Sequence, residues 1–435
     1  MGVFLMKLKE LQGYIQSAAA FRCVAELQPA GGPGDKVFPP TYADAAYAQE
    51  LRIVPGYEKP VRCVLLDSVQ SQANRAEEAL QDAIDDGRIK IPVVEVDFTD
   101  IPVVEPGSTE EGLYEPIGRV TSLEAPHRIA DAILRDSELD GQPFRSSAEG
   151  KKIVMATLRN ATPIFELCPT ALIYGIWDST GPKGGLGVKF QRAVVSEIIG
   201  IDAALGNKTS SRMDPLSITL KAGPVYEGKD GTWTTEATEA KLDNKKKPTL
   251  VGKEGKPSEV NHGNIVPSLS ETSRDPLNEF ERIYLAGGVT IRKAEQTTVI
   301  SLPALRRLRF PLGNNSKPNQ EANLAAQSVL AALALCGAVL AAEKGLDLRS
   351  RCLLALTKKP SWEVVAGDGA EPKKFELDAR TAIALLNEAI QAAKSAGLPW
   401  RDEPLVLKPA KKLVDLVRKS QDLAVKSGAE EGADA

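Results

Sequence analysis

Nothing in the sequence limits the possible folds as strongly as the stretch from Leu324 to Ala342. This stretch is almost wholly apolar and is bounded by Glu321 and Glu343. Its length permits a membrane span. However, it is rich in alanine rather than leucine, contains Gln327, and stands alone in the chain. The sequence therefore predicts a buried, closely packed helix and no membrane partner.

A strand followed by a helix is predicted before residue 85. Val61 to Leu66 is a short apolar run with β-branched residues, and Asp67 and Ser68 after it supply helix N-cap chemistry. The amphipathic segment Val69 to Ile84 then has helical periodicity. This order predicts a strand, a turn and a helix.

The middle of the chain interleaves further predicted strands and helices. The prolines in Ile91 to Glu115 favour an edge strand or an extended loop. A helix is expected near His127 to Arg135, buried strands at Ile153 to Leu158 and Thr170 to Trp177, and a helix at Arg192 to Ile201. The fold class that follows is α+β.

The second half of the chain changes character twice. Residues 227–264 are dominated by Gly, Lys, Thr and Glu, so we expect an insertion that contributes little to a core. Strand-like sequence returns at Arg282 to Ile300. From Asn319 onward the chain is predicted to be mainly helical, ending in an amphipathic Lys411 to Lys426 segment and a frayed tail. We therefore expect one domain over residues 1–320 and a helical region over residues 321–435.

Charge is unevenly distributed along the 435 residues. The net charge is −4, with 43% hydrophobic residues, which excludes a disordered chain or a polycation. Residues 77–140 hold 17 acidic and 5 basic side chains, a net of −12, so the remainder sums to +8. A basic surface for a polyanion is compatible with this balance.

Metal, cofactor and catalytic motifs are not found in the sequence. The five cysteines lie far apart with no C-x-x-C pair, which argues against disulfides and zinc and fits a reducing cytoplasm. The two histidines, His127 and His262, form no recognised motif, and the glycine-rich segments fit neither a phosphate loop nor a dinucleotide fingerprint. Trp177-Asp178-Ser179 offers a carboxylate with no identifiable partner. We expect no cofactor, no metal and no secretion signal.

Four segments place polar or basic side chains beside glycines or helix starts. In Leu66 to Arg75, a helix N-terminus with free N–H groups favours phosphate. In Lys183 to Arg192, glycines permit close approach of a ligand and Phe190 offers a stacking face. Asn207 to Arg212 and Gly287 to Phe310 add further basic loops. A solvated helix face, a plain hairpin and a simple turn remain open for the first, second and third segments respectively. In the fourth, some of Arg306, Arg307 and Arg309 are expected to be structural or paired with the acidic segment, because alternate arginines on a helix cannot all face one way. The candidate RNA-binding residues are Ser68, Gln70, Gln72, Asn74, Arg75, Lys183, Lys189, Phe190, Arg192, Lys208, Arg212, Arg292, Lys293, Arg306 and Arg307.

Long motifs occur in one order between residues 35 and 312. They are PPTY from Pro39, LDSVQSQANR from Leu66, HRIADAILRDSELDG from His127, PTALIYGIWDS from Pro169, KFQRAVVSEIIGID from Lys189, SSRMDPL from Ser210, HGNIVPS from His262, GGVT from Gly287 and SLPALRRLRF from Ser301. In these motifs the chain resembles the CRISPR-associated backbone subunit of the type I-G (formerly I-U) Cascade complex. That subunit is a Cas-seven-like member of the RAMP superfamily.

This resemblance implies an RRM-like (ferredoxin-like) palm with a polar thumb insertion at about residues 217–280. It also implies a protein that binds CRISPR RNA without cleaving it and assembles in several copies along the guide. Target DNA is then read through the guide by base pairing. The expected partners include a guide-processing subunit and a large subunit. By the same resemblance, the side chains expected along guide phosphates are Ser68, Gln70, Gln72, Asn74 and Arg75.

Two other functions remain open from the sequence. One is a RAMP-type guide RNA-processing endoribonuclease that uses Lys and Tyr side chains. The other is a scaffold that binds only protein, which would have no salt-sensitive affinity for RNA.

Overall fold

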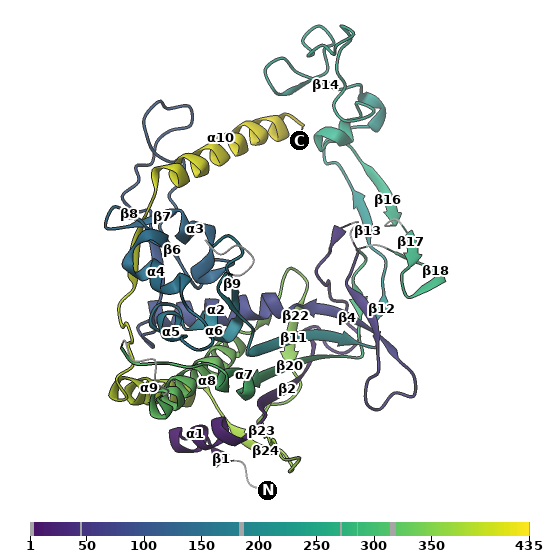
Figure 1. The fold of residues 1–435 in the computed structure, drawn as a ribbon. Helices are drawn as coiled ribbons and strands as arrows, with labels where there is room; N and C mark the ends of the chain where they lie inside the picture. The colour runs from purple at the N-terminus through teal and green to yellow at the C-terminus, as the bar shows by residue number, and fades with distance from the viewer. Residues whose placement is uncertain are drawn as a thin grey trace. The chain divides into compact units, whose positions relative to one another are not determined.

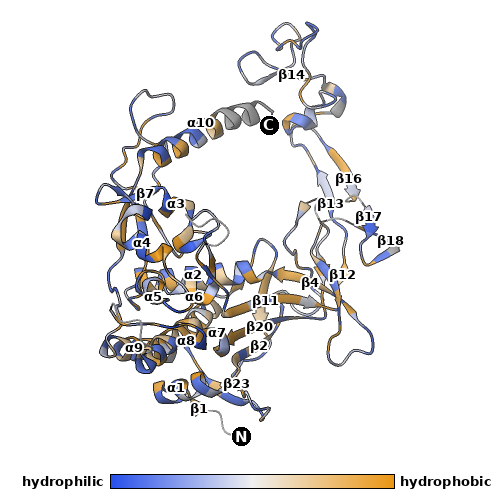
Figure 2. Ribbon diagram, viewed as in Figure 1, coloured by the Kyte–Doolittle hydropathy of each residue, from blue (hydrophilic) through white to orange (hydrophobic). Residues whose placement is uncertain are grey.

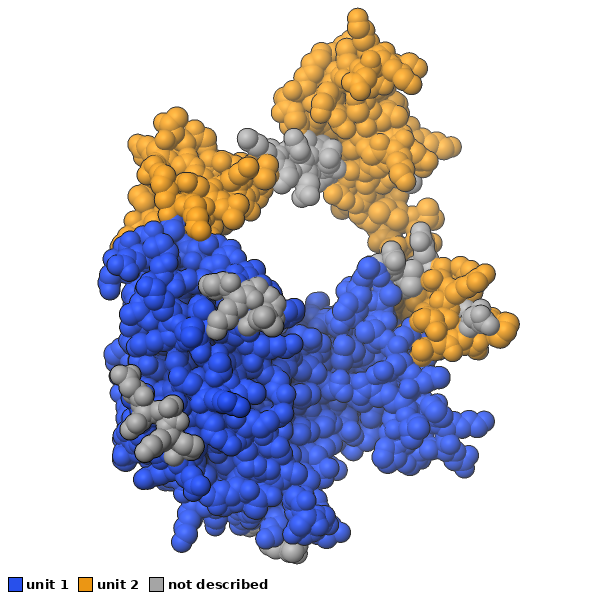
Figure 3. Space-filling view, in the orientation of Figure 1, with its two compact units in different colours: residues 1–98, 117–204, 288–410 blue, residues 99–116, 205–287, 411–435 orange. Residues whose placement is uncertain are grey.

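The computed structural model describes residues 4–43, 46–181, 187–269, 272–284, 286–313 and 319–434. The chain divides into two compact units, each built from three segments (Figure 3). The first unit comprises residues 1–98, 117–204 and 288–410, and the second comprises residues 99–116, 205–287 and 411–435. Residues 321–410 belong to the first unit and residues 411–435 to the second.

A ten-stranded sheet forms the centre of the first unit (Figure 1). The four longest strands pair antiparallel in the order β2-β20-β11-β4. The ten strands are β1 (Phe4–Leu5), β2 (Ala20–Pro29), β3 (Gln49–Arg52), β4 (Val61–Asp67), β11 (Val194–Ile201), β20 (Lys293–Ser301), β21 (Leu346–Asp347), β22 (Leu353–Leu356), β23 (Trp362–Val365) and β24 (Lys373–Glu376).

Side chains along the strands alternate between the two faces of this sheet, and helices cover one of these faces. Phe21 of β2, Ile300 of β20 and Val194 of β11 stand in register and are all buried. The helices α2 (Val69–Asp85) and α8 (Gln320–Glu343) pack against this face. Figure 2 shows apolar residues in the central strands and in the helices near them. The fold is α+β, as the sequence predicts.

The helix α8 confirms the prediction of a buried apolar helix. Among the described residues it is the one helix long and apolar enough to cross a membrane, but 83% of its apolar window is buried inside the protein. Its N-cap Asn319 accepts a hydrogen bond from the backbone of Ala322 at 3.0 Å. A Cβ at Gly337 would lie 2.8 Å from the Tyr174 hydroxyl oxygen, so a small residue is required where the helix meets Tyr174.

The remaining helices of the first unit are short, apart from α1 and α9. They are α1 (Leu8–Ser17), α3 (Ala132–Arg135), α4 (Ala148–Val154), α5 (Thr162–Leu167), α6 (Thr170–Tyr174), α7 (Leu302–Arg306) and α9 (Ala379–Ser395), with 3₁₀ turns at Arg128–Ala130 and Phe144–Ser146.

Three predicted elements are of the wrong type. The expected strand at Ile153 to Leu158 holds the end of the helix α4, Ile153 and Val154, followed by a turn. The expected strand at Thr170 to Trp177 is mainly the helix α6, because a short run buried on all sides has no periodicity that separates the two states. The expected helix at Arg192 to Ile201 is the strand β11. Its β-branched side chains and its pairing on both edges favour a strand.

A second sheet of the first unit has the order β6-β5-β25-β7-β8. Its strands are β5 (Val94–Asp97), β6 (Arg119–Thr121), β7 (Ser137–Leu139), β8 (Gln142–Pro143) and β25 (Leu405–Pro409). The sequence predicts an edge strand or loop here, but β5 is wholly buried and pairs on both sides. The prolines Pro92 and Pro102 lie outside the strand, so they do not interrupt its ladder. The strand β25, from the C-terminal part of the chain, completes this sheet. The sequence predicts a mainly helical region from Asn319 onward and so missed this strand.

The second unit contains the polar insertion. Its strands are β13 (Thr209–Arg212), β14 (Tyr226–Glu227), β15 (Trp233–Thr234), β16 (Ile265–Leu269), β17 (Thr272–Asp275) and β18 (Asn278–Tyr284), with 3₁₀ turns at Leu220–Ala222 and Pro257–Val260 and the helix α10 (Lys411–Asp434). The insertion does have a small core, of Val225, Val251 and Val260. The segment that holds the insertion, residues 205–287, leaves the first unit within β12 (Ala204–Leu205). The chain returns to the first unit just before β19 (Val289–Thr290). α10 extends to Asp434, where the sequence predicts a frayed tail.

Candidate nucleic-acid interface

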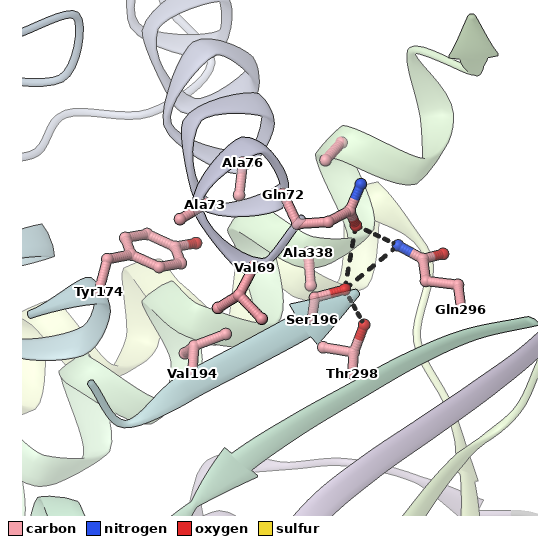
Figure 4. Close-up of a pocket in the computed structure, with 11 residues that line it drawn as sticks. Val69, Gln72, Ala73, Ala76, Tyr174, Val194, Ser196, Gln296, Thr298 and Ala338 are labelled. Atoms are coloured by element: carbon pink, nitrogen blue, oxygen red, sulfur yellow. Dashed lines mark hydrogen bonds between the residues drawn. The ribbon is translucent and has the colours of Figure 1, made fainter. Parts of the chain in front are cut away.

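The polar motif at the start of α2 is largely turned inward. Ser68 is the N-cap and accepts a hydrogen bond from the backbone N–H of Ser71 at 3.2 Å. The buried Gln72 amide donates to Asp67 Oδ2 at 2.6 Å, and its oxygen accepts from Ser196 Oγ at 3.0 Å and Gln296 Nε2 at 2.7 Å (Figure 4). These bonds join the helix to the strands β11 and β20 and leave Gln72 no exposed polar group.

Arg75 is also part of the internal structure. Its Nε donates to the buried Asp67 Oδ2 at 3.0 Å, and its NH2 donates to the Leu348 carbonyl at 2.7 Å. Arg349 lies 3.6 Å from the other oxygen of Asp67. The guanidinium expected to bind phosphate is thus engaged in holding α2 to the loop after β21. In this motif Gln70 and Asn74 are the exposed candidates.

An open groove of about 640 Å³ lies beside the N-terminal part of α2 in the first unit. It is lined by side chains from within residues 126–135, 174–180 and 189–192, together with Gln70. Its cationic side chains are Arg128, Arg135, Lys189 and Arg192. Asp178 is the single carboxylate among the lining residues, and it is paired with Arg145 at 2.6 Å. Arg128 and Arg135 are paired with Glu77 and Asp136, each at 2.6 Å, so the positive balance of the groove comes from Lys189 and Arg192.

Arg128 forms the buried floor of this groove. Its guanidinium donates to both oxygens of Glu77, at 2.7 and 2.6 Å, and to the Gly175 carbonyl at 3.1 Å. Its central carbon lies 5.5 Å from the centre of the Tyr174 ring. Arg128 has a φ of +52°, an unusual conformation for a non-glycine residue. The bidentate pair neutralises Arg128 and fixes the floor in position.

Like Lys189, Arg192 is a cation of the groove without an ion pair to another described residue. It is half-buried and has no hydrogen bond or ion pair with any other described residue. Burial and the nearby charge of Arg128 lower the pKa of its guanidinium, although an arginine stays charged at neutral pH. A phosphate beside Arg192 would supply the missing negative charge, because an unpaired, partly desolvated cation is unfavourable.

A short hairpin places an aromatic ring beside these cations. β9 (Ile176–Trp177) pairs with β10 (Lys189–Phe190), with Trp177 opposite Lys189. Lys189 Nζ lies 5.2 Å from the centre of the Trp177 ring, which is 56% exposed. Phe190 points the other way and is 3% exposed. The expected stacking face on Phe190 is therefore in the core, and the exposed ring is that of Trp177.

Three further candidates are Lys183, Lys208 and Arg212. Lys183 is outside the described residues. Lys208 is exposed and belongs to the second unit, as does Arg212. Arg212 stabilises the antiparallel pair of β13 and β16 by donating to the carbonyls of Gly263 and His262 at 3.0 and 2.8 Å.

The basic residues after β19 differ among themselves. Arg292 pairs with Asp202 at 2.7 Å, and Lys293 pairs with Glu295 at 3.2 Å. Arg306 donates to the carbonyls of Ile15 and Ala18, at 2.7 and 2.8 Å, at the end of α1. Arg306 is therefore a structural residue rather than a ligand contact.

Arg307 is different, because it is exposed and has no partner among the described residues. It lies at a second cavity, of about 220 Å³.

The structure thus brings together Gln70, Lys189 and Arg192 from two predicted segments. It adds Trp177, Arg128 and Arg135, which were not among the sequence candidates. A signal for Trp177 was present, since a glycine-dense loop between two short strands predicts a hairpin and would place Trp177 near Lys189.

Comparison with known proteins gives one family match. Residues 21–205 match the model of a family described as CRISPR-associated protein GSU0053. All residues that line the groove fall within this range. No curated protein matches the chain. The family match supports a CRISPR-related function and other CRISPR-associated proteins as partners.

Proposed function

We propose that this protein binds CRISPR RNA as the backbone subunit of a type I-G Cascade complex. In this role it holds the guide for pairing with target DNA, does not cleave RNA, and works in the cytoplasm in antiviral defence. The observation that carries the proposal is the groove in which the unpaired Arg192 lies near Lys189 and the exposed ring of Trp177. The family match over the same residues supports it.

Single-stranded RNA suits this groove for two physical reasons. Cations that follow the backbone and aromatic rings that stack on bases are the usual combination for binding single strands without sequence preference. Arg192 can meet a phosphate, while Trp177 and Gln70 lie where bases or riboses would pass. The guide sequence is then left free to be read by base pairing.

The proposal also assigns roles to other parts of the chain. The strands β2, β20, β11 and β4, with α2 and α8, would form the RRM-like palm. The hairpins of the second unit would form the thumb. Further copies of the chain would assemble along the guide, with a guide-processing subunit and a large subunit as additional partners.

A guide RNA-processing endoribonuclease is the second candidate. The observation that favours it is His127, which lines the same groove as Lys189 and could take part in proton transfer. A single-turnover cleavage assay on CRISPR repeat RNA separates the two candidates. Cleavage that is lost in His127→Ala but kept in His262→Ala would favour the nuclease.

The test of the main proposal is co-expression with a CRISPR array and the partner subunits. The expected result is a large particle that contains guide-length RNA, with affinity that falls steeply as salt is raised. A nucleic-acid-free monomer, with the partners demonstrably present, would contradict the proposal. That result would leave a scaffold that binds only protein.

A further inference from the structure

A small pocket in the first unit is formed by residues of α2, α6, α8, β11 and β20 (Figure 4). Its volume is about 30 Å³. None of the eleven described residues that line it is charged. An ion would therefore find no opposite charge in this pocket to offset the loss of its hydration.

The hydroxyl of Tyr174 is a buried polar group of this pocket. Tyr174 is 2% exposed, and its Oη has no hydrogen-bond partner among the described residues. Figure 4 shows this hydroxyl directed toward the other lining residues. Burial raises the pKa of the hydroxyl, so it keeps its proton at neutral pH and can donate a hydrogen bond. Because a buried hydroxyl without a partner is unfavourable, Tyr174 requires an acceptor here.

A network of four polar side chains lines another part of the pocket. The Gln72 amide nitrogen donates to Asp67 Oδ2 at 2.6 Å, which turns its oxygen toward Ser196 and Gln296. Ser196 Oγ donates to Gln72 Oε1 at 3.0 Å, and Gln296 Nε2 donates to the same oxygen at 2.7 Å. Since Ser196 has one proton, the 2.8 Å bond between Ser196 and Thr298 takes its proton from Thr298.

This order of protons leaves Thr298 as an acceptor. Its Oγ1 has donated to Ser196 and keeps its lone pairs, and Thr298 itself is 5% exposed. The pocket therefore contains a hydroxyl that needs an acceptor, at Tyr174, and a hydroxyl oxygen that can accept, at Thr298.

Water meets both requirements. It accepts the proton of one group and donates its own protons to others, whereas a cation such as ammonium can only donate. The pocket volume of about 30 Å³ exceeds the ~10–15 Å³ that one buried water needs, so one or two molecules fit.

The ring of Tyr174 links this pocket to the groove. Tyr174 lines both hollows, and the central carbon of the Arg128 guanidinium lies 5.5 Å from the centre of its ring. A hydrogen bond at the hydroxyl end would hold in place the ring that lies beside Arg128, the buried floor of the groove.

We propose that this pocket is a hydration site, in which ordered water accepts a hydrogen bond from the Tyr174 hydroxyl and donates to Thr298 Oγ1, directly or through a second water. This inference goes beyond the proposed function, because it concerns the interior behind the groove and requires no RNA. Its failure would leave the proposed function standing.

A crystal structure of the full-length chain, at a resolution that shows ordered water, tests the site directly. The expected result is a water within hydrogen-bonding distance of Tyr174 Oη that connects to Thr298. A pocket without density, or a water bonded to neither hydroxyl, would overturn the proposal.

Thermal melts of Tyr174→Phe separate a hydrated pocket from a dry one by the sign of the change. With water bound, the variant loses a hydrogen bond and melts about 1–3 °C lower. In a dry pocket the same substitution removes an unpaired buried hydroxyl, so the variant would melt higher than the wild type.

A second variant tests whether the pocket and the hydroxyl are coupled. Ala338→Val adds methyl groups at the pocket and should displace water. Ala342→Val is the matched control for the cost of a β-branched residue in α8, since Ala342 is exposed and does not line the pocket. Ala338→Val should lower the melting temperature more than its control does, and this excess should shrink in the Tyr174→Phe background. An equal effect in both backgrounds would contradict the proposal.

Discussion

The start of α2 and the groove beside it use similar residues in opposite ways. At the start of α2, Arg75 and Gln72 are bonded to the buried Asp67 and hold the helix in place. In the groove, Arg192 has no partner among the described residues and Trp177 is exposed. Basic and polar side chains in a motif therefore do not by themselves indicate a binding surface. What matters is whether the protein already provides their partners.

The largest expected effect follows from Asp67→Ala. The substitution leaves Arg75 and Arg349 beside a buried site without their carboxylate, so we expect a loss of about 3–5 kcal/mol in the free energy of unfolding. Urea denaturation measures it. Asp67→Asn keeps the shape and part of the hydrogen bonding and should lose less. A wild-type midpoint for Asp67→Ala would show that this cluster does not hold α2.

Arg75→Ala tests the same cluster from its cationic side. Loss of the bonds to Asp67 and Leu348 should lower stability by ~1–3 kcal/mol, a range typical for hydrogen bonds to charged groups. RNA affinity of the folded variant should change less than about twofold. If instead the salt dependence of RNA binding falls while stability is unchanged, Arg75 contacts phosphate and the contrast with Arg192 fails.

Trp177→Ala probes the groove. Loss of a stacked ring should weaken RNA binding by ~1–3 kcal/mol, with the salt dependence kept and stability changed by less than about 0.5 kcal/mol. Fluorescence anisotropy at two salt concentrations measures both quantities. Tyr42→Ala, which removes an exposed aromatic ring of the first unit that does not line the groove, is the control. Equal losses in the two variants would show that Trp177 has no special role.

Arg192→Ala should give the smallest change in RNA affinity, but a change in salt dependence that is specific to a phosphate contact. Removal of one phosphate contact lowers the slope of log K against log salt by ~0.7 for a single strand, equally for different guide sequences. Stability should not fall, because Arg192 has no described partner to lose. Arg292→Ala, which removes an exposed arginine paired with Asp202, should leave the slope unchanged. An effect of Arg192→Ala on some guide sequences only would argue for base contact instead.

Local patterns predicted several elements correctly. The strand β4 and the helix α2 follow from the apolar run and the N-cap Ser68, since both signals are local in sequence. The apolar stretch of α8 predicted a buried helix because a surface helix of that composition would be unfavourable in water. By contrast, β11 and α6 were assigned to the wrong class. In α6 every residue is buried, which removes the periodicity on which such predictions depend. In β11 the pairing with β20 and β4, which comes from distant parts of the chain, decides for a strand.

The candidate site was harder to predict from local sequence patterns than the helices and strands were. Glycines and basic residues predicted that Lys189 and Arg192 belong to a ligand-binding segment, and the structure places both in the groove. The sequence did not show that Phe190 turns inward, since one residue of register decides which face of a strand a side chain takes. It also did not show that Arg306 ends at carbonyls of α1, nearly 300 residues away along the chain.

The sequence by itself determined the mixed α+β class, the buried apolar helix, and a chain whose basic residues outside the 77–140 segment outnumber its acidic ones. These properties follow from composition and from patterns a few residues long. Only the tertiary structure decided which cations are neutralised internally and which face a groove. A guanidinium binds whichever acceptor the fold brings within hydrogen-bonding distance, and for Arg75 and Arg306 those acceptors come from distant parts of the chain.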